Sequence, residues 1–380
     1  MLLGSGLTNI TTNRKNLSNW RQPFGKSSNF AVLFGGEKPT TLKRGTIIVV
    51  NQKRKKSNPG EILMKAVVCT KYGPPEVLEL AEMEKPVPKS DQVLINVKAT
   101  AVTASDCIIR AFKMPGDHKF PVKQFMELMM GVALGFTKPK NPIIGLVLAG
   151  DIESVGQDVK LFKKGDQVYG FTGYSMGAYA EYTCMSEKES TRGCLAIKPS
   201  NMSYEQAAAV SYGGILATHY LKKGNIQNGE SMLIYGASGA IGTTAIQLAK
   251  CYDAHITAVC SSRNFDLVKS LGADKVIDYT KKDSINMLEV YDFVLDAVGK
   301  NKSSELKVQC KKALKPDGRY VSVDDGNVKL SSAYLVQLGE FIEAGKVTVA
   351  IDRRYPLEEI VEAHRYVDQG HKKGNVVITL

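Results

Sequence analysis

The stretch of sequence that decides the fold runs Leu233-Ile-Tyr-Gly236-Ala237-Ser238-Gly239-Ala240-Ile241-Gly242. An apolar strand pattern precedes the glycines and a helical pattern follows them, which is the context of a dinucleotide-binding turn. Gly239 would let the backbone approach a pyrophosphate, and Gly242 would allow close helix–strand packing. The N–H groups that open the helix would hold the phosphates. This context favours dinucleotide binding over a purely structural glycine turn, with all seven residues from Gly236 to Gly242 as contacts.

Strands and helices alternate around this turn, which predicts βαβ units and a parallel sheet covered on both faces. The box Ser203-x-x-Gln206 predicts the start of an earlier helix over 207–221. Strands are expected over 232–235, 256–260, 275–277, 293–296 and 320–323, and helices over 240–252, 265–271 and 303–314.

Short apolar runs separated by turn residues predict a compact β-rich module before this α/β part. Residues 108–142 read as an insertion, with a helix near 123–134. Past Ser331 we expect one more helix, then a helix near 357–367 and a closing strand over 375–379. The strands of the module are expected over 64–69, 92–97, 144–149, 167–171 and 178–184.

The end of the second strand of the α/β part predicts which dinucleotide binds. An acid is expected there if the ribose 2′-hydroxyl is free. The sequence instead reads Ser261-Ser262-Arg263, and Asp266 follows inside the next helix. Two hydroxyls and a guanidinium suit a 2′-phosphate, so NADPH is predicted over NADH. The alternative is that Arg263 is a solvated residue at a helix start.

The positive charge of the chain is concentrated at its beginning. The net charge is +12 over 380 residues, and residues 1–63 carry +9 of it, with eleven Lys or Arg against two Glu. Three interpretations stay open for this segment: a transit peptide, a nucleic-acid-binding arm, or a flexible extension ahead of a folded protein that starts at Met64. Its composition, rich in Asn, Ser, Thr and Gly, favours the extension.

Composition also limits where the protein works. The richest apolar run, 126–136, is too short for a membrane span and contains Glu127, so no membrane partner is expected. Seven scattered cysteines with no C-x-x-C pair argue against a disulfide framework and indicate a reducing compartment. We therefore expect a cytoplasmic location.

Several further motifs resemble those of the zinc-free quinone oxidoreductase branch of the medium-chain dehydrogenase/reductase superfamily, over about 64–380. They accompany the glycine-rich turn, in chain order: Tyr72-Gly-Pro-Pro-Glu-Val-Leu78, Ala101-Val-Thr-Ala-Ser-Asp106, Phe162-Lys-Lys-Gly-Asp-Gln-Val-Tyr-Gly170, Gly177-Ala-Tyr-Ala-Glu-Tyr182 and Asp296-Ala-Val-Gly299. The resemblance implies a GroES-like substrate domain over 64–190, completed by 346–380, around a Rossmann domain over 191–345. It also favours a homodimer.

The resemblance implies particular site residues as well. Asp106 and Arg110 would line the substrate cleft, although Thr103 stands where the family usually has Asn. Tyr212 is either a hydrogen-bond donor near the nicotinamide or a core tyrosine. Tyr279 would contact the 2′-phosphate, and the turn containing Ala297 and Val298 would pass the nicotinamide ribose.

Zinc-dependent members of the superfamily place ligands near positions 103, 146 and 210. This chain has Thr103, Leu146 and Val210-Ser211 there, so no metal is predicted. Hydride transfer from NADPH to a quinone or to the double bond of an α,β-unsaturated carbonyl is then the expected reaction. A zinc alcohol dehydrogenase is one alternative. A nucleotide-binding regulator, or a nucleic-acid-binding protein that uses the basic leader, is another, although nucleic acid is not the favoured partner.

Overall fold

The structure, a computed structural model, describes residues 62–113, 122–299, 304–326 and 328–380. They belong to one compact unit. The basic leader, apart from its last two residues, lies outside the described residues, and so does the alternative function that depends on it. Among the described helices, none is long and apolar enough to cross a membrane.

Five parallel strands form the sheet expected around the glycine-rich turn, in the order β10-β9-β8-β11-β12. The order reverses between β8 and β11, and ligands of such sheets bind outside the carboxyl ends of the strands at this switch point. The strands are β8 (Ser231–Tyr235), β9 (His255–Cys260), β10 (Lys275–Asp278), β11 (Tyr291–Asp296) and β12 (Leu314–Ser322).

Helices cover both faces of this sheet, as alternation along the strands requires. Met232 and Ile234 of β8 pack with α3, α4 and α5, whereas Leu233 and Tyr235 pack with α6 on the other face. These helices are α3 (Tyr204–Lys223), α4 (Ala240–Lys250), α5 (Phe265–Ser270) and α6 (Glu305–Lys312). The doubly wound fold predicted from the sequence is confirmed.

A second, β-rich sheet has the order β13-β14-β3-β4-β5-β7, with β6 also paired to β3. Strands β13 and β14 of this sheet come from the C-terminal end of the chain, and β14 runs antiparallel to β3. A separate pair, β1 (Leu63–Cys69) and β2 (Leu78–Glu84), lies beside it. The sheet strands are β3 (Gln92–Val102), β4 (Val147–Val155), β5 (Gln167–Phe171), β6 (Tyr182–Ser186), β7 (Cys194–Ile197), β13 (Ile351–Pro356) and β14 (Asn375–Thr379).

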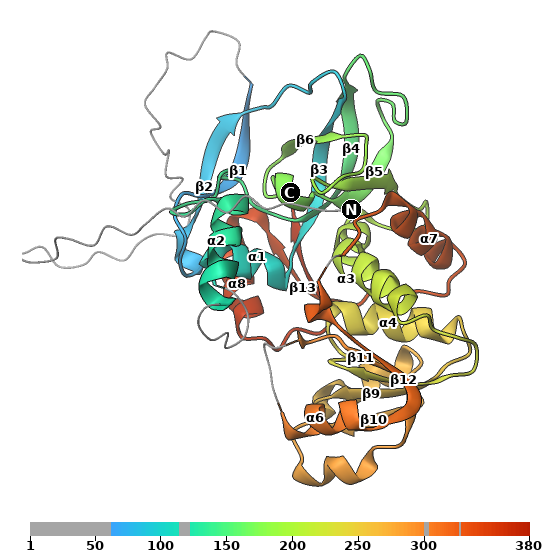
Figure 1. The fold of residues 1–380 in the computed structure, drawn as a ribbon. Coiled ribbons are helices and arrows are strands. Elements are labelled where there is room, and N and C mark those ends of the chain that lie inside the picture. The colour runs from blue at the N-terminus through green and yellow to red at the C-terminus, as the bar shows by residue number, and fades with distance from the viewer. Residues whose placement is uncertain (1–61, 114–121, 300–303, 327) are drawn as a thin grey trace, which may run out of the picture. The chain divides into compact units, whose positions relative to one another are not determined.

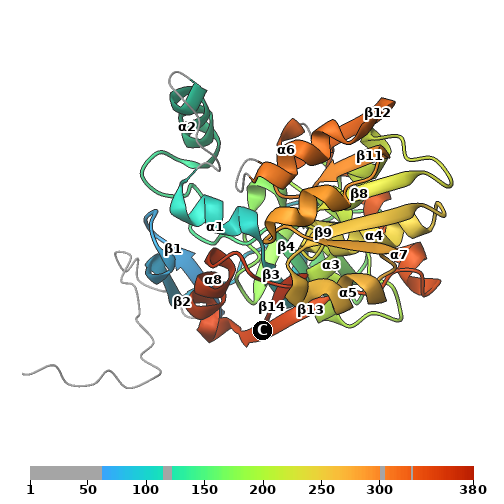
Figure 2. The same ribbon diagram turned by 90° about the horizontal axis from the view of Figure 1, so that it is seen from below.

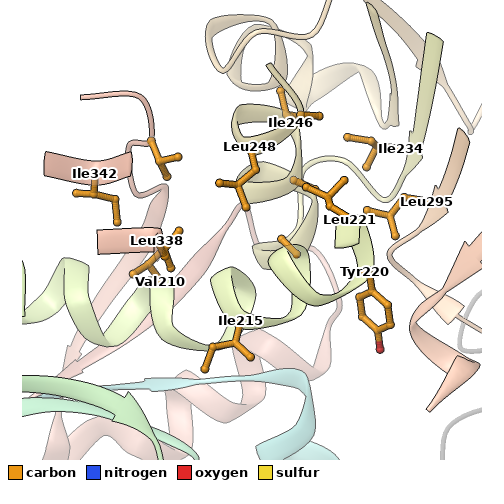
Figure 3. Packing of buried hydrophobic residues seen from close by; sticks show 14 of the residues in the cluster. Val210, Ile215, Tyr220, Leu221, Ile234, Ile246, Leu248, Leu295, Leu338 and Ile342 are labelled. Carbon is orange, nitrogen blue, oxygen red and sulfur yellow. The ribbon is translucent and has the colours of Figure 1, made fainter. Parts of the chain in front are cut away.

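Four further helices complete the fold (Figures 1 and 2): α1 (Ala104–Ala111), α2 (Val122–Leu134), α7 (Ser332–Glu343) and α8 (Ile360–Asp368). Helix α3 packs against both sheets and against α4 and α7. Figure 3 shows Val210, Ile215 and Leu221 of α3 among residues of α4, α7 and the parallel strands. The Ser203–Gln206 capping box predicted at its start is present.

Several elements differ from the sequence prediction. Strand β3 continues to Val102, and β12 already starts at Leu314. Strand β4 is shifted toward its C-terminal end, and β6 starts at Tyr182 because Tyr179 and Ala180 pair with the first strand instead. The sequence did not predict β2, β7, β13 or α1. Strand β2 reads Leu-Glu-Leu-Ala-Glu-Met-Glu, whose residues favour helix. It is a strand because all seven residues pair with β1.

Candidate functional site

The glycine-rich turn leaves β8 and opens α4, and two of its glycines are required by packing. Gly236 has φ +82°, and a Cβ there would lie 2.4 Å from Cγ2 of Val298. A Cβ at Gly242 would lie 2.5 Å from the carbonyl oxygen of Gly236. Both contacts are far inside van der Waals distance, so these positions accept no side chain without a shift of the turn.

Gly239 is a glycine for another reason. Its φ of −82° suits any residue, and a Cβ would meet only the carbonyl oxygen of Gly236, at 3.4 Å. Gly239 is the N-cap of α4, and no side chain caps this helix. A helix N-terminus with unbonded N–H groups and open space above it is suited to a phosphate.

Ser261, Ser262 and Arg263 follow β9 at the same edge of the sheet. Arg263 is exposed, and its Nε donates to Oγ of Ser261 at 3.3 Å. Buried Asn264 joins this segment to the glycine-rich turn, because its Nδ2 donates to Oγ of Ser238 at 3.0 Å and of Ser261 at 3.4 Å. Its Oδ1 is buried without a partner among the described residues. The sequence analysis did not predict Asn264 as a site residue, and a buried amide cannot be distinguished from an exposed one by its position alone.

An acid also lies beside this segment, supplied by the neighbouring strand. The carboxylate of Asp278, at the end of β10, accepts from N and Oγ1 of Thr280 at 2.9 and 2.7 Å, and from N of Ser262 at 3.3 Å. Burial raises its pKa, but these hydrogen bonds more than offset burial, so the pKa lies below its usual value. The half-exposed ring of Tyr279 follows, 6.4 Å from the ring of Tyr235.

The turn after β11 closes over Gly236. Asp296 is buried, and its carboxylate accepts from the N–H groups of Val298 and Gly299, both at 3.1 Å, and pairs with Lys307 at 2.7 Å. The N–H of Ala297 donates to the carbonyl of Tyr235 at 2.9 Å. The structure therefore places Ala297 and Val298 against the glycine-rich turn.

The C-terminal strand reaches the same turn from the β-rich sheet. The N–H of Gly374 donates to the carbonyl of Ser238 at 2.8 Å, and Gly374 forms a bridge with Gly239. Nζ of Lys372 donates to the carbonyl of Gly374 at 2.5 Å, and burial lowers the pKa of this lysine to about 8. The sequence analysis did not identify these residues, because no local pattern links positions more than 130 residues apart.

The predicted substrate-side residues lie on α1 and α3. Buried Asp106 caps α1, with Oδ2 accepting from N and Oγ1 of Thr103 at 2.8 and 2.6 Å. Its Oδ1 has no hydrogen-bond partner within the described ranges, and burial raises its pKa to about 7. The hydroxyl of Tyr212 lies 2.7 Å from Oγ of Ser105, which links α3 to α1.

Arg110 points into the protein rather than away from it. Its guanidinium donates to the carbonyl of Gly73 at 3.1 Å and to Asp368 at 2.8 Å, and lies 3.1 Å from Nδ1 of His364. Burial and the nearby Arg110 lower the pKa of His364 to about 3. In this arrangement Arg110 holds α1 against α8.

No group of three or more His, Cys, Asp or Glu in the described part of the chain could hold a metal ion. At the positions where zinc-dependent relatives have ligands, Thr103 caps α1, Leu146 is buried and Ser211 donates to the carbonyl of Ala207. These donors do not fit a zinc site.

Comparison with known proteins agrees with this geometry. A family model described as alcohol dehydrogenase GroES-like domain matches residues 89–195, and two described as zinc-binding dehydrogenase match 240–349 and 326–378. The chain is 32% identical to 2-methylene-furan-3-one reductase of Solanum lycopersicum and to a chloroplastic NADPH-dependent alkenal/one oxidoreductase of Arabidopsis thaliana. Each match covers 83% of this chain and 79% of the relative. A quinone oxidoreductase structure from Coxiella burnetii superposes with a TM-score of 0.70, at 26% identity over 84% of this chain and all of the other.

The two-sheet fold and the glycine-rich turn at the switch point define an oxidoreductase of the NAD(P)H-dependent class. The chain belongs to the medium-chain dehydrogenase/reductase superfamily, in its quinone oxidoreductase branch.

The two glycines of the turn should respond differently to alanine. Gly239→Ala should leave the melting temperature nearly unchanged and weaken NADPH binding at least tenfold, because its methyl group occupies the open space above α4. Gly242→Ala should cost about 1–3 kcal/mol of unfolding free energy through the backbone clash. Thermal unfolding and NADPH fluorescence titration measure both effects. Unchanged NADPH affinity in Gly239→Ala would show that the dinucleotide does not approach there.

Asp106 should make stability depend on pH. The native state keeps a proton up to about pH 7 that the unfolded chain loses near its ordinary pKa of 3.8, so the unfolding free energy falls as pH rises between these values. As pH rises across this range, the unfolding free energy of Asp106→Asn should increase relative to that of wild type by about 1.4 kcal/mol per pH unit. Urea unfolding at several pH values measures the difference, with Ser105→Ala as a control whose effect does not vary with pH. A constant difference for Asp106→Asn contradicts the assignment.

Proposed function

We propose that this chain is an NADPH-dependent reductase of quinones or of the activated double bond of α,β-unsaturated carbonyl compounds. The observation that carries the proposal is the uncapped N-terminus of α4, with open space at Gly239, beside a segment of two serines and an arginine. Relatives named as alkenal/one and furanone reductases, and a structural relative named as a quinone oxidoreductase, support the substrate class.

The chain's own residues fit the parts of NADPH in order. The N–H groups at the start of α4 would bind the pyrophosphate. Hydroxyls of Ser261 and Ser262, the guanidinium of Arg263 and the hydroxyl of Tyr279 would take the 2′-phosphate. Asn264 donates to Ser238 and Ser261, which leaves both serine hydroxyl protons free to donate to the cofactor. Ala297 and Val298 would pass the nicotinamide ribose.

Bound NADPH would supply the hydride, and the protein then has to hold the acceptor and provide a proton for its oxygen. Tyr212 directly precedes Gly213, where α3 contacts the start of α4, and its hydroxyl is linked to that of Ser105, so we place the carbonyl or quinone oxygen beside these two hydroxyls. Burial raises the pKa of Tyr212, so the hydroxyl stays protonated and can donate. Asp106 and Arg110 would act as positioning residues, because their bonds fix α1 behind Ser105.

We also propose that the substrate domain comprises 64–190 and 346–380, that residues 191–345 bind the cofactor, and that the protein works as a cytoplasmic homodimer. The return of β13 and β14 to the β-rich sheet supports the second boundary. Strand β7 (Cys194–Ile197) also belongs to that sheet, so the first boundary would fall after Ile197 and not at 190. The location rests on the scattered cysteines alone, and one relative is named as chloroplastic.

A turnover panel tests the function. Purified full-length protein should oxidise NADPH with quinones, enones or alkenals, and much less with saturated ketones, which lack the activated bond. Chelators should leave the rate unchanged, because the described residues offer no zinc site. If the protein oxidises NADPH with none of these acceptors, the proposal is wrong.

Arg263→Ala tests the cofactor preference separately. One charged contact to the 2′-phosphate contributes about 1.5–3 kcal/mol, so the KM for NADPH should rise about 10- to 100-fold while that for NADH changes little. Added salt should weaken NADPH binding to wild type more than to the variant. Arg192→Ala, another exposed arginine, is the matched control. If wild type uses both cofactors equally and Arg263→Ala changes neither KM, Arg263 only faces solvent.

A further inference from the structure

Helix α2 exposes a continuous apolar stripe. Phe125, Leu128, Met129 and Val132 recur at the spacing of one helix face, and Phe136 follows the helix. Their exposed fractions lie between 51% and 64%. Their exposure is not a sign of an unanchored helix, because Met130 and Leu134 on another side pack into the β-rich half. The stripe is an outward-facing surface of an anchored helix.

Most of the charged side chains around the stripe are basic. Lys138 and Lys140, which follow the helix, are exposed, and so is Lys113 at the end of α1; Glu127 is the one acid among described residues 111–113 and 124–142. Nζ of Lys140 donates to the carbonyl of Val132 at 2.5 Å, which holds this lysine at the C-terminal end of the helix. An apolar face with basic side chains at its rim is complementary to an anionic lipid surface.

The size and place of the stripe disfavour a second copy as its occupant. Five side chains that are about half exposed offer on the order of 400–500 Å², whereas a stable protein interface needs about 800 Å² per partner. Figure 2 shows α2 at the periphery of the ribbon, away from both sheets. A projecting helix can enter a bilayer interface without a complementary flat surface around it.

We propose that the α2 stripe docks this protein on an anionic membrane surface, with the five apolar side chains inserted at the headgroup boundary and the three lysines over the headgroups. This inference goes beyond the reductase activity and does not depend on it. It departs from the expectation of no membrane partner, which rested on the lack of a membrane-spanning segment. It concerns attachment to one leaflet, which is compatible with the absence of a membrane-spanning helix among the described residues.

Vesicle binding by the full chain tests the proposal. Phosphatidylcholine vesicles containing phosphatidylserine should bind the protein about 100-fold more tightly than phosphatidylcholine alone, if each lysine contributes as surface lysines commonly do. Leu128→Gln with Val132→Gln should reduce binding at least tenfold, whereas Leu161→Gln with Val336→Gln, at exposed apolar positions elsewhere, should not. NADPH turnover of both double variants checks that they fold.

The basic leader could bind anionic vesicles by itself, so a second readout identifies the contact. Leu128→Trp should be quenched by brominated lipid in anionic vesicles, and Leu161→Trp should not, each corrected for the natural Trp20. Equal binding by both double variants, or no quenching at position 128, would overturn the proposal. So would a shift from dimer to monomer in the stripe variant without vesicles, which would make the stripe a contact between copies.

Discussion

The close contact between α3 and the start of α4 is the constraint on which the rest of the structure depends. A Cβ at Gly213 would lie 2.4 Å from the carbonyl oxygen of Ala240, and one at Gly214 would lie 2.1 Å from a methyl group of Leu338. Because α3 also packs against β3, β4, β5 and β14, its distance from α4 sets how the parallel sheet stands against the β-rich sheet. Gly213 makes the approach to α4 possible and Gly214 the approach to α7, and helix propensity alone would disfavour both glycines.

This contact is one of three that hold the glycine-rich turn in place. Its position is fixed below by Gly213 against Ala240, laterally by Val298 against Gly236, and from the β-rich sheet by the bond from Gly374 to Ser238. All three constraints act on the backbone or on the partly buried side chain of Val298. Gly239 is bridged to Gly374, but a Cβ at Gly239 would meet only the carbonyl oxygen of Gly236, at 3.4 Å. Under the proposed function, a phosphate would therefore approach a turn that needs no rearrangement.

The sequence predicted what local patterns specify. The strand–turn–helix around Gly239 and the capping box at Ser203 are confirmed, because each depends on residues within a few positions of one another. Strand β2 was missed because its Glu, Met and Ala residues favour helix, and only pairing with β1 makes it extended. Lys372 and Gly374 were missed for a stronger reason: their place beside Ser238 results from β14 returning to β3, which no local pattern encodes. Arg110 was expected to line the substrate cleft, and only the structure shows that its guanidinium contacts His364 and Asp368.

Asp278 shows why the charge of a cofactor site cannot be read from one strand end. The segment after β9 lacks an acid, yet the neighbouring strand brings a carboxylate to it. That carboxylate accepts hydrogen bonds from Thr280 and from the N–H of Ser262, so its oxygens are already bonded within the protein. It therefore orders the serine segment. It would oppose a 2′-phosphate through its charge, whereas the proposed contact with Arg263 would be direct. Under the proposed function, the preference between the two cofactors would depend on the balance between the exposed guanidinium of Arg263 and the buried carboxylate of Asp278.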